Sequence, residues 1–267
     1  MRIMLQHPRV EIISNENLGN GLFKTSFRSV DIAKSLKPGN FVHIRVSSGM
    51  DPLFRRAMSV HWKENDTFSI LFRVLGKGTR ALSALREGEF VDVVGPLGNT
   101  FDTPNPDEKM IMVAGGTGLP PLHYFSRWLI EEQRFNRQNI SFLFGVSSQA
   151  DVRLVDDVEA IGLPLRISSD DGSVGHKGFV TDLLKQEIEK SDVATTRVCS
   201  CGPENMLREI IRICAEDEIR CQVSLEGNMP CGIGTCLGCV VQSSESDQEF
   251  KRICKEGPIF NGSEVKL

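Results

Sequence analysis

Short hydrophobic runs separated by turn-forming residues fill roughly the first hundred positions of the chain. Glycine, proline and asparagine mark the breaks, as at 17–21, 37–39 and 95–98. Many short strands with turns between them are typical of a closed antiparallel barrel. The expected strands are 9–13, 22–29, 40–46, 57–62, 67–74 and 90–94. One helix is expected at 79–86, because Thr79 can cap its start and Gly88 can end it.

The pattern changes after Thr-Pro-Asn-Pro at 103–106, a candidate linker. A buried strand at 110–114 runs into a glycine turn and then an amphipathic helix that continues to about residue 134. Strands at 140–144, 165–168, 197–200 and 221–225 and helices at 181–189 and 204–216 follow. This alternation predicts a doubly wound parallel sheet with helices on both faces. We therefore expect a barrel domain at 1–104, an α/β domain at 105–220 and a small C-terminal subdomain at 221–267.

Composition narrows the class of protein. A chain of 267 residues with 40% hydrophobic and 25% charged residues is an ordinary globular protein of two domains or slightly more. A net charge of −4, without a basic patch, gives no reason to expect nucleic acid. The start of the chain lacks a signal-peptide core, and no segment reaches transmembrane length. Eight cysteines without a secretion signal indicate metal ligands and reduced thiols, so we expect a cytoplasmic protein.

Four of these cysteines follow the spacing C-x4-C-x2-C…C, which holds a [2Fe–2S] cluster in plant-type ferredoxins. They are Cys231, Cys236, Cys239 and Cys254. The glycines between them let the backbone fold closely around two irons and aim amides at the sulfurs. A structural zinc site also takes four thiolates, but its ligands usually come as two C-x2-C knuckles, which the x4 interval does not match. The spacing favours the cluster over zinc.

A second candidate site is the turn Gly115-Gly116-Thr117-Gly118, directly after a strand and before a helix. Backbone amides and the helix N-terminus can bind a pyrophosphate there, although a tight strand–helix connection would look the same. No acidic residue stands at 144–148, so the sequence does not separate NADH from NADPH. Cys201-Gly202-Pro203 follows the fourth strand and should reach the same edge of the sheet, where Cys201 can border a nicotinamide.

Two barrel segments also suit a dinucleotide. Arg55 and Arg56 open the strand Ala57-Met58-Ser59 with two guanidinium groups, and Gly76-Lys77-Gly78-Thr79 precedes the short helix. The same residues would also occur in a charged edge strand and an ordinary helix cap that bind no ligand. The remaining cysteines (Cys199, Cys214, Cys221) and the histidines His43, His61 and His123 are expected to be structural.

Together these segments resemble the ferredoxin–NADP reductase superfamily over essentially the whole chain. The resemblance implies FAD binding by Arg56, Ala57, Met58 and Ser59, with Leu71, Phe72, Arg73, Gly78 and Thr79. It implies binding of the nicotinamide nucleotide by residues 115–121 and 201–203. In electron transfer subunits of this superfamily the FAD strand usually reads R-R-P-I-S, whereas Ala57 and Met58 stand here. Many reductases stack an aromatic residue on the flavin at the position of Met58.

Residues 73–79, 170–178, 231–241 and 254–260 are similar to the electron transfer subunits of NAD-dependent dihydroorotate dehydrogenase B. This resemblance implies a chain that carries FAD, a [2Fe–2S] cluster and NAD(H) and splits two-electron packages into single electrons. It also implies an FMN-containing catalytic partner in a heterotetramer of two plus two, with the dihydroorotate site on that partner. Ile233, Leu237 and Phe260 are candidates for the partner-facing surface, although Ile233 and Leu237 could equally be core.

Two other functions stay open. The chain could serve another complex as an NAD(P)H reductase subunit, for example a ferredoxin-dependent transhydrogenase or a hydrogenase. It could also be a non-catalytic iron–sulfur redox sensor. Neither alternative involves nucleic acid or a membrane.

Overall fold

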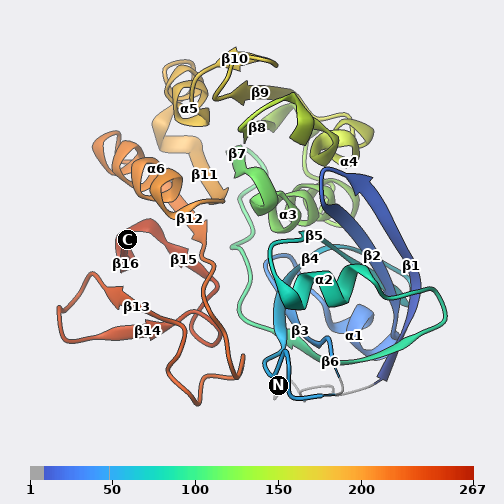
Figure 1. Ribbon diagram of the computed structural model, residues 1–267. Coiled ribbons are helices and arrows are strands. Elements are labelled where there is room, and N and C mark those ends of the chain that lie inside the picture. The colour runs from blue at the N-terminus through green and yellow to red at the C-terminus, as the bar shows by residue number, and fades with distance from the viewer. Residues whose placement is uncertain (1–8, 48) are drawn as a thin grey trace.

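The computed structural model describes residues 9–47 and 49–267 of the chain. It contains a closed barrel, a seven-stranded sheet and a three-stranded sheet (Figure 1). The prediction of an antiparallel barrel, a doubly wound α/β domain and a small C-terminal part is confirmed. The segment in which no signal-peptide core was seen, residues 1–8, lies outside the described residues.

Six antiparallel strands close the barrel in the order β1-β2-β5-β4-β3-β6. Their bounds are β1 (Arg9–Gly19), β2 (Leu22–Arg28), β3 (Phe41–Arg45), β4 (Arg56–Glu64), β5 (Thr67–Arg73) and β6 (Phe90–Leu97). The barrel is filled by buried side chains such as Phe27 and Phe68, whose rings stack with centroids 5.1 Å apart. The helix α1 (Val30–Ser35) was not predicted; Ser29 caps it by accepting a hydrogen bond from the amide of Ile32.

The second barrel helix, α2 (Lys77–Ser83), begins two residues earlier than the predicted 79–86 and also ends earlier. Gly76 is its N-cap, and Thr79 stands at the third helical position. The hydroxyl of Thr79 reaches back to accept hydrogen bonds from the amides of Leu75 (2.9 Å) and Gly76 (3.1 Å). The capping role predicted for Thr79 was therefore misplaced by one helical turn, since the threonine satisfies the start of the helix from inside it.

The seven-stranded sheet has the order β10-β9-β8-β7-β11-β12-β15, in which the first six strands are parallel and β15 is antiparallel. The bounds are β7 (Lys109–Gly115), β8 (Ile140–Val146), β9 (Leu165–Ser169), β10 (His176–Lys177), β11 (Thr196–Cys201), β12 (Arg220–Ser224) and β15 (Ile259–Asn261). The segment predicted as the last strand is β12, so β15 extends the sheet by one strand that the sequence did not reveal.

Helices cover both faces of this sheet, as predicted. On the face toward the barrel, α3 (Leu119–Glu131) and α4 (Asp156–Ala160) pack in a common core with residues of β7 and β8. On the other face lie α5 (Val180–Ile188) and α6 (Glu204–Glu216). Short 3-10 turns are η1 (Gly116–Gly118), η2 (Arg137–Asn139), η3 (Gln149–Val155), η4 (Val193–Thr195) and η5 (Gly262–Glu264). Neither η3, α4 nor β10 was predicted.

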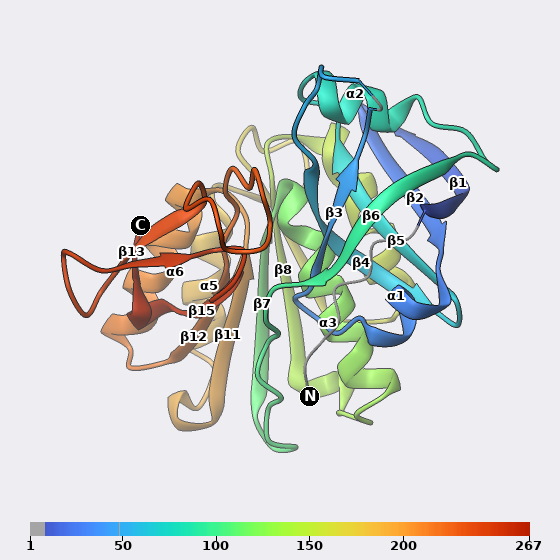
Figure 2. The same cartoon turned by 90° about the horizontal axis from the view of Figure 1, so that it is seen from below.

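The C-terminal part forms a three-stranded sheet of β14 (Phe250–Arg252), β13 (Val240–Ser243) and β16 (Val265–Lys266). Figure 2 shows this part beside β11 and β12, with a loop that reaches toward the barrel. Asn99, just after β6, ties the barrel to it: its amide donates to the carbonyl of Gly257 (2.8 Å), and its side chain pairs with both backbone groups of Ile259 (2.7 and 2.9 Å).

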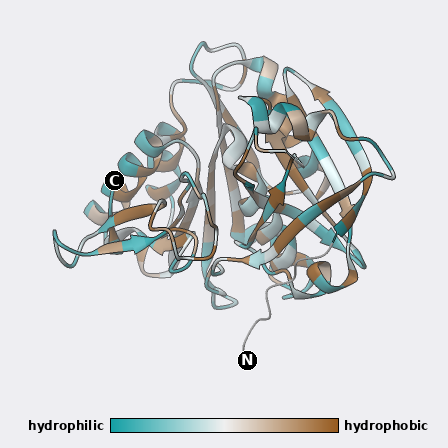
Figure 3. Cartoon of the chain, turned by 60° about the horizontal axis from the view of Figure 1, so that its bottom comes forward, coloured by the Kyte–Doolittle hydropathy of each residue, from teal (hydrophilic) through white to brown (hydrophobic). Residues whose placement is uncertain are grey.

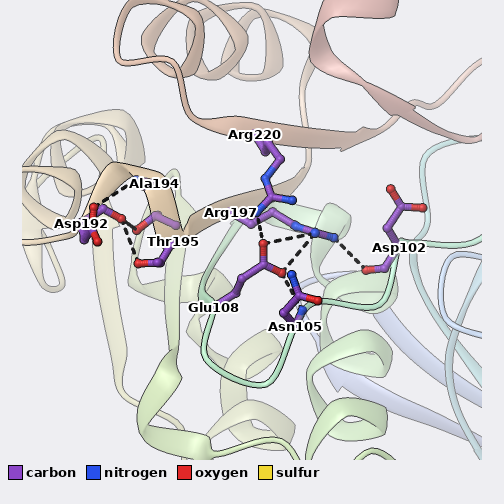
Figure 4. A network of polar contacts seen from close by, with 9 residues as sticks. Asp102, Asn105, Glu108, Asp192, Ala194, Thr195, Arg197 and Arg220 are labelled. Carbon is purple, nitrogen blue, oxygen red and sulfur yellow. Dashed lines mark hydrogen bonds and ion pairs between the residues drawn. The ribbon is translucent and has the colours of Figure 1, made fainter.

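The amino edge of the parallel sheet is closed by a buried ion network (Figure 4). Glu108, only 3% exposed, accepts from Arg197 at 3.1 Å and also from Arg220. The backbone amide of Asn105 donates to the same carboxylate, so the end of the predicted linker is pinned to β11 and β12. Glu108 is thus neutralised by two arginines, and the network joins the starts of β7, β11 and β12.

Hydrophobic residues lie along the strands, while the loops and outer helix faces are mainly hydrophilic (Figure 3). Across residues 9–47 and 49–267, none of the helices combines the length and hydrophobicity needed to span a bilayer.

Candidate functional site

The four predicted cluster ligands lie in a loop between β12 and β13 and in the turn after β14. Gly232 and Gly234 adopt φ values of +69° and +81°, which the loop needs in order to fold back on itself. Backbone amides point at the sulfurs, as expected: Gly234 N lies 3.1 Å from Cys254 Sγ, and Gly238 N lies 3.4 Å from Cys236 Sγ. The loop is shaped around its thiols.

The thiols form two pairs, Cys231 with Cys236 and Cys239 with Cys254, each in hydrogen-bond contact. Within the described residues, no group of three or more histidine, cysteine or acidic side chains is arranged to hold one metal ion. A single tetrahedral zinc needs four converging ligands, whereas each iron of a [2Fe–2S] cluster takes two of the four thiolates. The pairing fits two irons better than one zinc.

The two pairs differ in acidity. Burial acts to raise the pKa of Cys231, but hydrogen bonds from the Thr235 hydroxyl and the loop amides prevail and lower it to about 5. Burial, and then the neighbouring Cys239, raises the pKa of Cys254 to about 12. Since thiolate is the form that binds metal, we expect one thiol to be ready at neutral pH and the buried one to lose its proton as metal binds.

The predicted FAD segments meet where β4 begins beside α2. The guanidinium of Arg56 lies over Gly78 so closely that a Cβ there would fall 2.0 Å from Arg56 Nε. An arginine over a helix N-terminus, with glycine in place of a side chain, is a fitting cradle for a diphosphate. Exposed apolar side chains border it at Phe54 (55%) and Leu75 (81%), and a flavin or adenine ring could cover them.

The neighbouring Arg55 is engaged differently. It forms a two-pronged ion pair with Asp92 on β6, with nitrogen–oxygen distances of 3.0 and 2.8 Å. Ser59 lies on the same strand as Arg56, paired with Phe41 in β3. The side chains of Ala57 and Met58 are half-buried, so Met58 packs against the barrel core. The structure thus brings Arg56, Gly78 and the start of α2 together, and Ser59 lies three residues further along β4.

The side chains of three further predicted FAD residues point into hydrophobic cores or into another cavity. The side chains of Leu71 and Phe72 are 5% and 4% exposed and belong to hydrophobic cores, so only their backbone can face a flavin. Arg73 donates to Asp151 at 2.7 Å and lines a cavity at the carboxyl edge of the parallel sheet. Alternation along β5 decides these directions, which the linear sequence did not reveal.

The glycine turn and the Cys201 turn meet at that carboxyl edge, in a cavity of about 850 Å³. Gly116 has a φ of +51° and faces open space, whereas a Cβ on Gly118 would fall 2.3 Å from the carbonyl oxygen of Cys201. A Cβ on Gly202 would fall 2.4 Å from the Met206 side chain and 3.0 Å from the amide nitrogen of Gly115. The glycines therefore let two strand ends touch and leave backbone, with Thr117, facing the cavity.

Cys201 contributes backbone more than its thiol. Its side chain is 1% exposed and packs in the core shared with α3, while Gly202 and Pro203 line the cavity. Burial, and then the nearby Glu226, raises the pKa of this thiol far above its usual range. A neutral buried thiol is a positioning group, so direct contact with nicotinamide stays a prediction.

Two residues of interest escaped the sequence analysis. Glu226 lies two residues after the end of β12 and lines the cavity; burial by the surrounding protein raises the pKa of its carboxyl group, although the residue is exposed toward the cavity. Its place after a parallel strand was the signal that could have found it. His43 was taken as structural, yet it is fully buried and lies against the cluster loop at Gly232. Nothing local in the sequence signals that contact.

The apolar residues expected on a partner-facing surface divide. Ile233 and Leu237, beside the cluster loop cysteines, are 43% and 62% exposed. Phe260 is 2% exposed, so this part of the prediction was wrong. Phe260 lies in β15, paired with Val223 of β12, and its ring packs in the core under α6.

Comparisons with known proteins agree with this geometry. Residues 226–266 match the iron-sulfur cluster binding domain of dihydroorotate dehydrogenase B, and residues 112–211 match an oxidoreductase NAD-binding domain. The electron transfer subunit of dihydroorotate dehydrogenase B (NAD(+)) from Bacillus velezensis is 33% identical, over 98% of this chain and all of that protein. The corresponding subunit from Desulforamulus reducens is 37% identical over 90% of both chains.

Solved structures extend the likeness. A chain from the structure of an NADH-dependent reduced ferredoxin-NADP oxidoreductase, studied for flavin-based electron bifurcation, superposes with a TM-score of 0.84 and 28% identity, covering 98% of this chain and 91% of that one. A ferredoxin NADP+ reductase from Neisseria gonorrhoeae with bound FAD and NADP superposes with a TM-score of 0.66 at 17% identity, covering 79% and 91%, and shows the fold alone.

Proposed function

We propose that this chain, which belongs to the family of dihydroorotate dehydrogenase B electron transfer subunits, passes electrons between NAD(H), FAD and a [2Fe–2S] cluster. We assign FAD to residues 1–104, NAD(H) to 105–220 and the cluster to 221–267. In the complete complex this transfer couples oxidation of dihydroorotate to orotate, on an FMN-bearing partner subunit, to reduction of NAD+. The reaction belongs to pyrimidine biosynthesis.

The observation that carries the proposal is the order of the three candidate sites in one chain. The glycine cavity lies at the carboxyl edge of the parallel sheet, the Arg56 cradle lies on the barrel, and the cluster loop packs against the barrel through Gly232 and His43. A nucleotide site, a flavin site and a cluster site in this spatial order suit stepwise electron transfer.

The residues would divide the work as follows. Arg56 and the start of α2 would hold the FAD diphosphate, and the amides around Gly116 would hold the nicotinamide nucleotide. The four loop cysteines would hold the two irons, and the loop amides would point at their sulfurs. When bound, FAD exchanges hydrides with NAD(H) and single electrons with the cluster. The Cys201–Gly202 turn would keep the nicotinamide beside the flavin, and neighbouring helices would exclude water.

The charges of the cavity favour NAD(H) over NADP(H). Five acidic side chains line it, at Asp151, Asp170, Asp182, Glu209 and Glu226, with only two basic ones, Arg73 and Lys185. Arg73 is paired with Asp151 (2.7 Å) and Lys185 with Glu209 (3.7 Å). A 2′-phosphate would add negative charge to an already acidic site, whereas a ribose hydroxyl can donate to a carboxylate. Steady-state kinetics with NADH and NADPH would check this preference.

The partner surface is proposed around the cluster loop. Leu237, Val240 and Phe250 are each more than 40% exposed and border one cavity beside this loop. Interface cores are enriched in such uncharged side chains. We propose an FMN-containing catalytic subunit as the occupant, in a heterotetramer of two plus two. We also propose a cytoplasmic location, because cluster thiolates stay reduced there.

The test compares the isolated chain with the chain bound to its partner. Alone, the FAD- and cluster-loaded protein should reduce artificial dyes with NADH and leave dihydroorotate unchanged. Together with the FMN-bearing partner, it should link orotate formation to NAD+ reduction in equal amounts. Orotate formed by the isolated chain would contradict the proposal, because it would require a substrate site on this chain.

A second function deserves its own test, because one structural neighbour belongs to a ferredoxin-dependent enzyme. The chain could deliver electrons from NADH within another complex of that kind. Anaerobic titration of the purified complex with dihydroorotate and, separately, with reduced ferredoxin would separate the two functions. A preparation with a cluster spectrum and no flavin would instead indicate a redox sensor.

A further inference from the structure

A buried histidine lies between the flavin barrel and the cluster loop. His43 stands in the middle of β3, in register with Ala57 on β4 and Val94 on β6. It is 0% exposed, and within the described residues neither ring nitrogen has a hydrogen-bond partner. A buried donor left without a partner loses its hydrogen bonds to water and gains none in the protein, so such a group calls for an explanation.

The ring is aimed at the cluster loop. A Cβ on Gly232 would lie 2.5 Å from His43 Nδ1 and 3.0 Å from Cε1, so only glycine fits there. Gly232 directly follows the cluster ligand Cys231. The carbonyl groups of Met229, Cys231 and Arg55 lie near enough to influence the ring, but none of the three forms a hydrogen bond of acceptable geometry with it. The loop therefore approaches the ring without satisfying it.

An imidazole carries at least one N–H donor in either protonation state. The loaded loop would bring thiolate and sulfide sulfurs, which accept hydrogen bonds, and such bonds help to set the potential of an iron–sulfur cluster.

We propose that His43 is a positioning residue between the two redox sites, donating its ring N–H to a sulfur of the assembled cluster and seating the cluster loop on the barrel through Gly232. This inference rests on the proposed function, since it takes the four cysteines to hold a cluster. It adds a residue that lies nearly two hundred positions from them in the sequence.

The first experiment measures the midpoint potential of the cluster in the loaded chain by EPR-monitored redox titration. His43→Phe keeps a ring and removes the N–H, so reduction should become at least tenfold less favourable, a drop of about 59 mV for a one-electron couple. His43→Gln keeps an N–H and should recover most of the loss. His123→Phe, the same change at another buried histidine, should leave the potential unchanged.

The outcomes distinguish failure of the proposed function from failure of the role proposed for His43. A wild-type chain that binds no cluster would overturn the proposed function and this inference with it. A wild-type cluster whose potential does not move in His43→Phe would overturn this inference alone. A shift of the flavin potential without a shift of the cluster potential would likewise overturn it, because the ring would then serve the flavin.

A second pair of variants tests the seat of the loop even if His43→Phe does not fold. Gly232 and Gly234 both have positive φ, so alanine strains the backbone at either position. A Cβ at Gly234 meets the flexible Lys255 side chain, whereas a Cβ at Gly232 meets the fixed His43 ring. Gly232→Ala should therefore lose its cluster several-fold faster than Gly234→Ala, followed by absorbance under chelator. Equal rates would contradict the proposed seat.

Discussion

Two buried histidines of the barrel, His43 on β3 and His61 on β4, make opposite kinds of contact. Both are 0% exposed, and both face another part of the chain. His61 Nε2 lies 2.7 Å from Asp157 of α4, and its ring stacks on His123 of α3 with centroids 4.2 Å apart. His43 faces the cluster loop with no hydrogen-bond partner in the described part of the chain.

His61 has one ring nitrogen, Nε2, paired within the chain, whereas its Nδ1 and both ring nitrogens of His43 have no hydrogen-bond partner among the described residues. The contact at His61 is therefore closed by an ion pair, and the contact at His43 is not. Around His61, Lys24 also pairs with Asp157 at 2.6 Å, so charges from both domains meet. The same contrast recurs between neighbours: Arg55 is held by Asp92, whereas the guanidinium of Arg56 lies over Gly78 at a helix start. Residue type alone does not distinguish these roles; the partner does.

The largest expected effect comes from removing a cluster ligand, beside the loop that His43 faces. Cys254→Ala removes one of four thiolates, and the second iron would lose one of its two ligands. We expect loss of the cluster absorbance and of nearly all iron, measured per chain by metal analysis. Cys214→Ala, a buried cysteine of α6 outside the loop, is the control and should keep two irons. Two irons with an unchanged spectrum in Cys254→Ala, or zinc in the wild type, would refute the cluster assignment.

The next effect sharpens the contrast between the two arginines. Arg56→Ala should weaken FAD binding about 100-fold, because hydrogen bonds to a charged group contribute about 1.5–3 kcal/mol each. Arg55→Ala should weaken FAD binding less than tenfold and instead lower stability, since it removes the partner of Asp92. Flavin fluorescence on dialysis measures both. Equal loss of FAD in the two variants would show that the R-x-x-S register is misplaced.

An intermediate effect comes from pH at the His61 contact. Burial, and then the charge of His61, lowers the pKa of His123 to about 3, and burial lowers that of His61 as well. In the unfolded chain both titrate near 6.5, so protons bind the unfolded state first and stability falls as pH drops from about 6.5 toward 3. His123 alone should account for about 2 kcal/mol between pH 7 and pH 5.

Urea unfolding followed by tryptophan fluorescence is the appropriate measurement. Trp62 lies edge-on to Tyr124 of α3 and Trp128 lies in α3 itself, so both tryptophans report on this contact. His123→Gln should flatten the pH dependence. The pKa of Asp157 is held low by its hydrogen bond from His61, so this carboxylate adds to the loss of stability only as pH falls toward its unfolded pKa of 3.8, below the interval from pH 7 to pH 5. A wild-type stability that rises toward pH 5 would reverse the assigned sign.

The smallest effect concerns the nucleotide turn. Gly118→Val places side-chain atoms against the carbonyl of Cys201, so it should displace the Cys201–Gly202 turn and raise the KM for NADH about tenfold while FAD stays bound. Gly116→Ala is the matched control: its Cβ meets open space, and only its positive φ is strained, so a change of a few-fold is expected. Steady-state kinetics with bound flavin quantified beforehand check both, and unchanged NADH kinetics in Gly118→Val would remove this turn from the site.

The sequence predicted features whose signals are local. The cysteine spacing, the strand–glycine–helix at Gly116 and the short strands of the barrel all depend on neighbours along the chain. Features that depend on distant neighbours were missed or misplaced. Phe260 was expected on the surface because the pairing of β15 with β12 has no local signal in the sequence. The burial of the Leu71 and Phe72 side chains likewise depends on which face of β5 turns inward, while their contact with a flavin stays a prediction. His43 gained its meaning only once β3 and Gly232 were seen in contact.

The return of the chain to the sheet after the cluster loop has a further consequence. Ser224, at the end of β12, pairs with Ile259 at the start of β15, and Leu225 donates to the carbonyl of Pro258 at 2.9 Å. The segments that lead into and out of the loop are therefore hydrogen-bonded to each other, and this pairing restricts motion of the loop as a rigid body. A cluster held in this loop should not move between an electron donor and an acceptor in the way that a tethered carrier domain does. The rate of electron transfer to a separate protein should therefore depend on how often that protein collides with the surface around the cluster loop, and in what orientation.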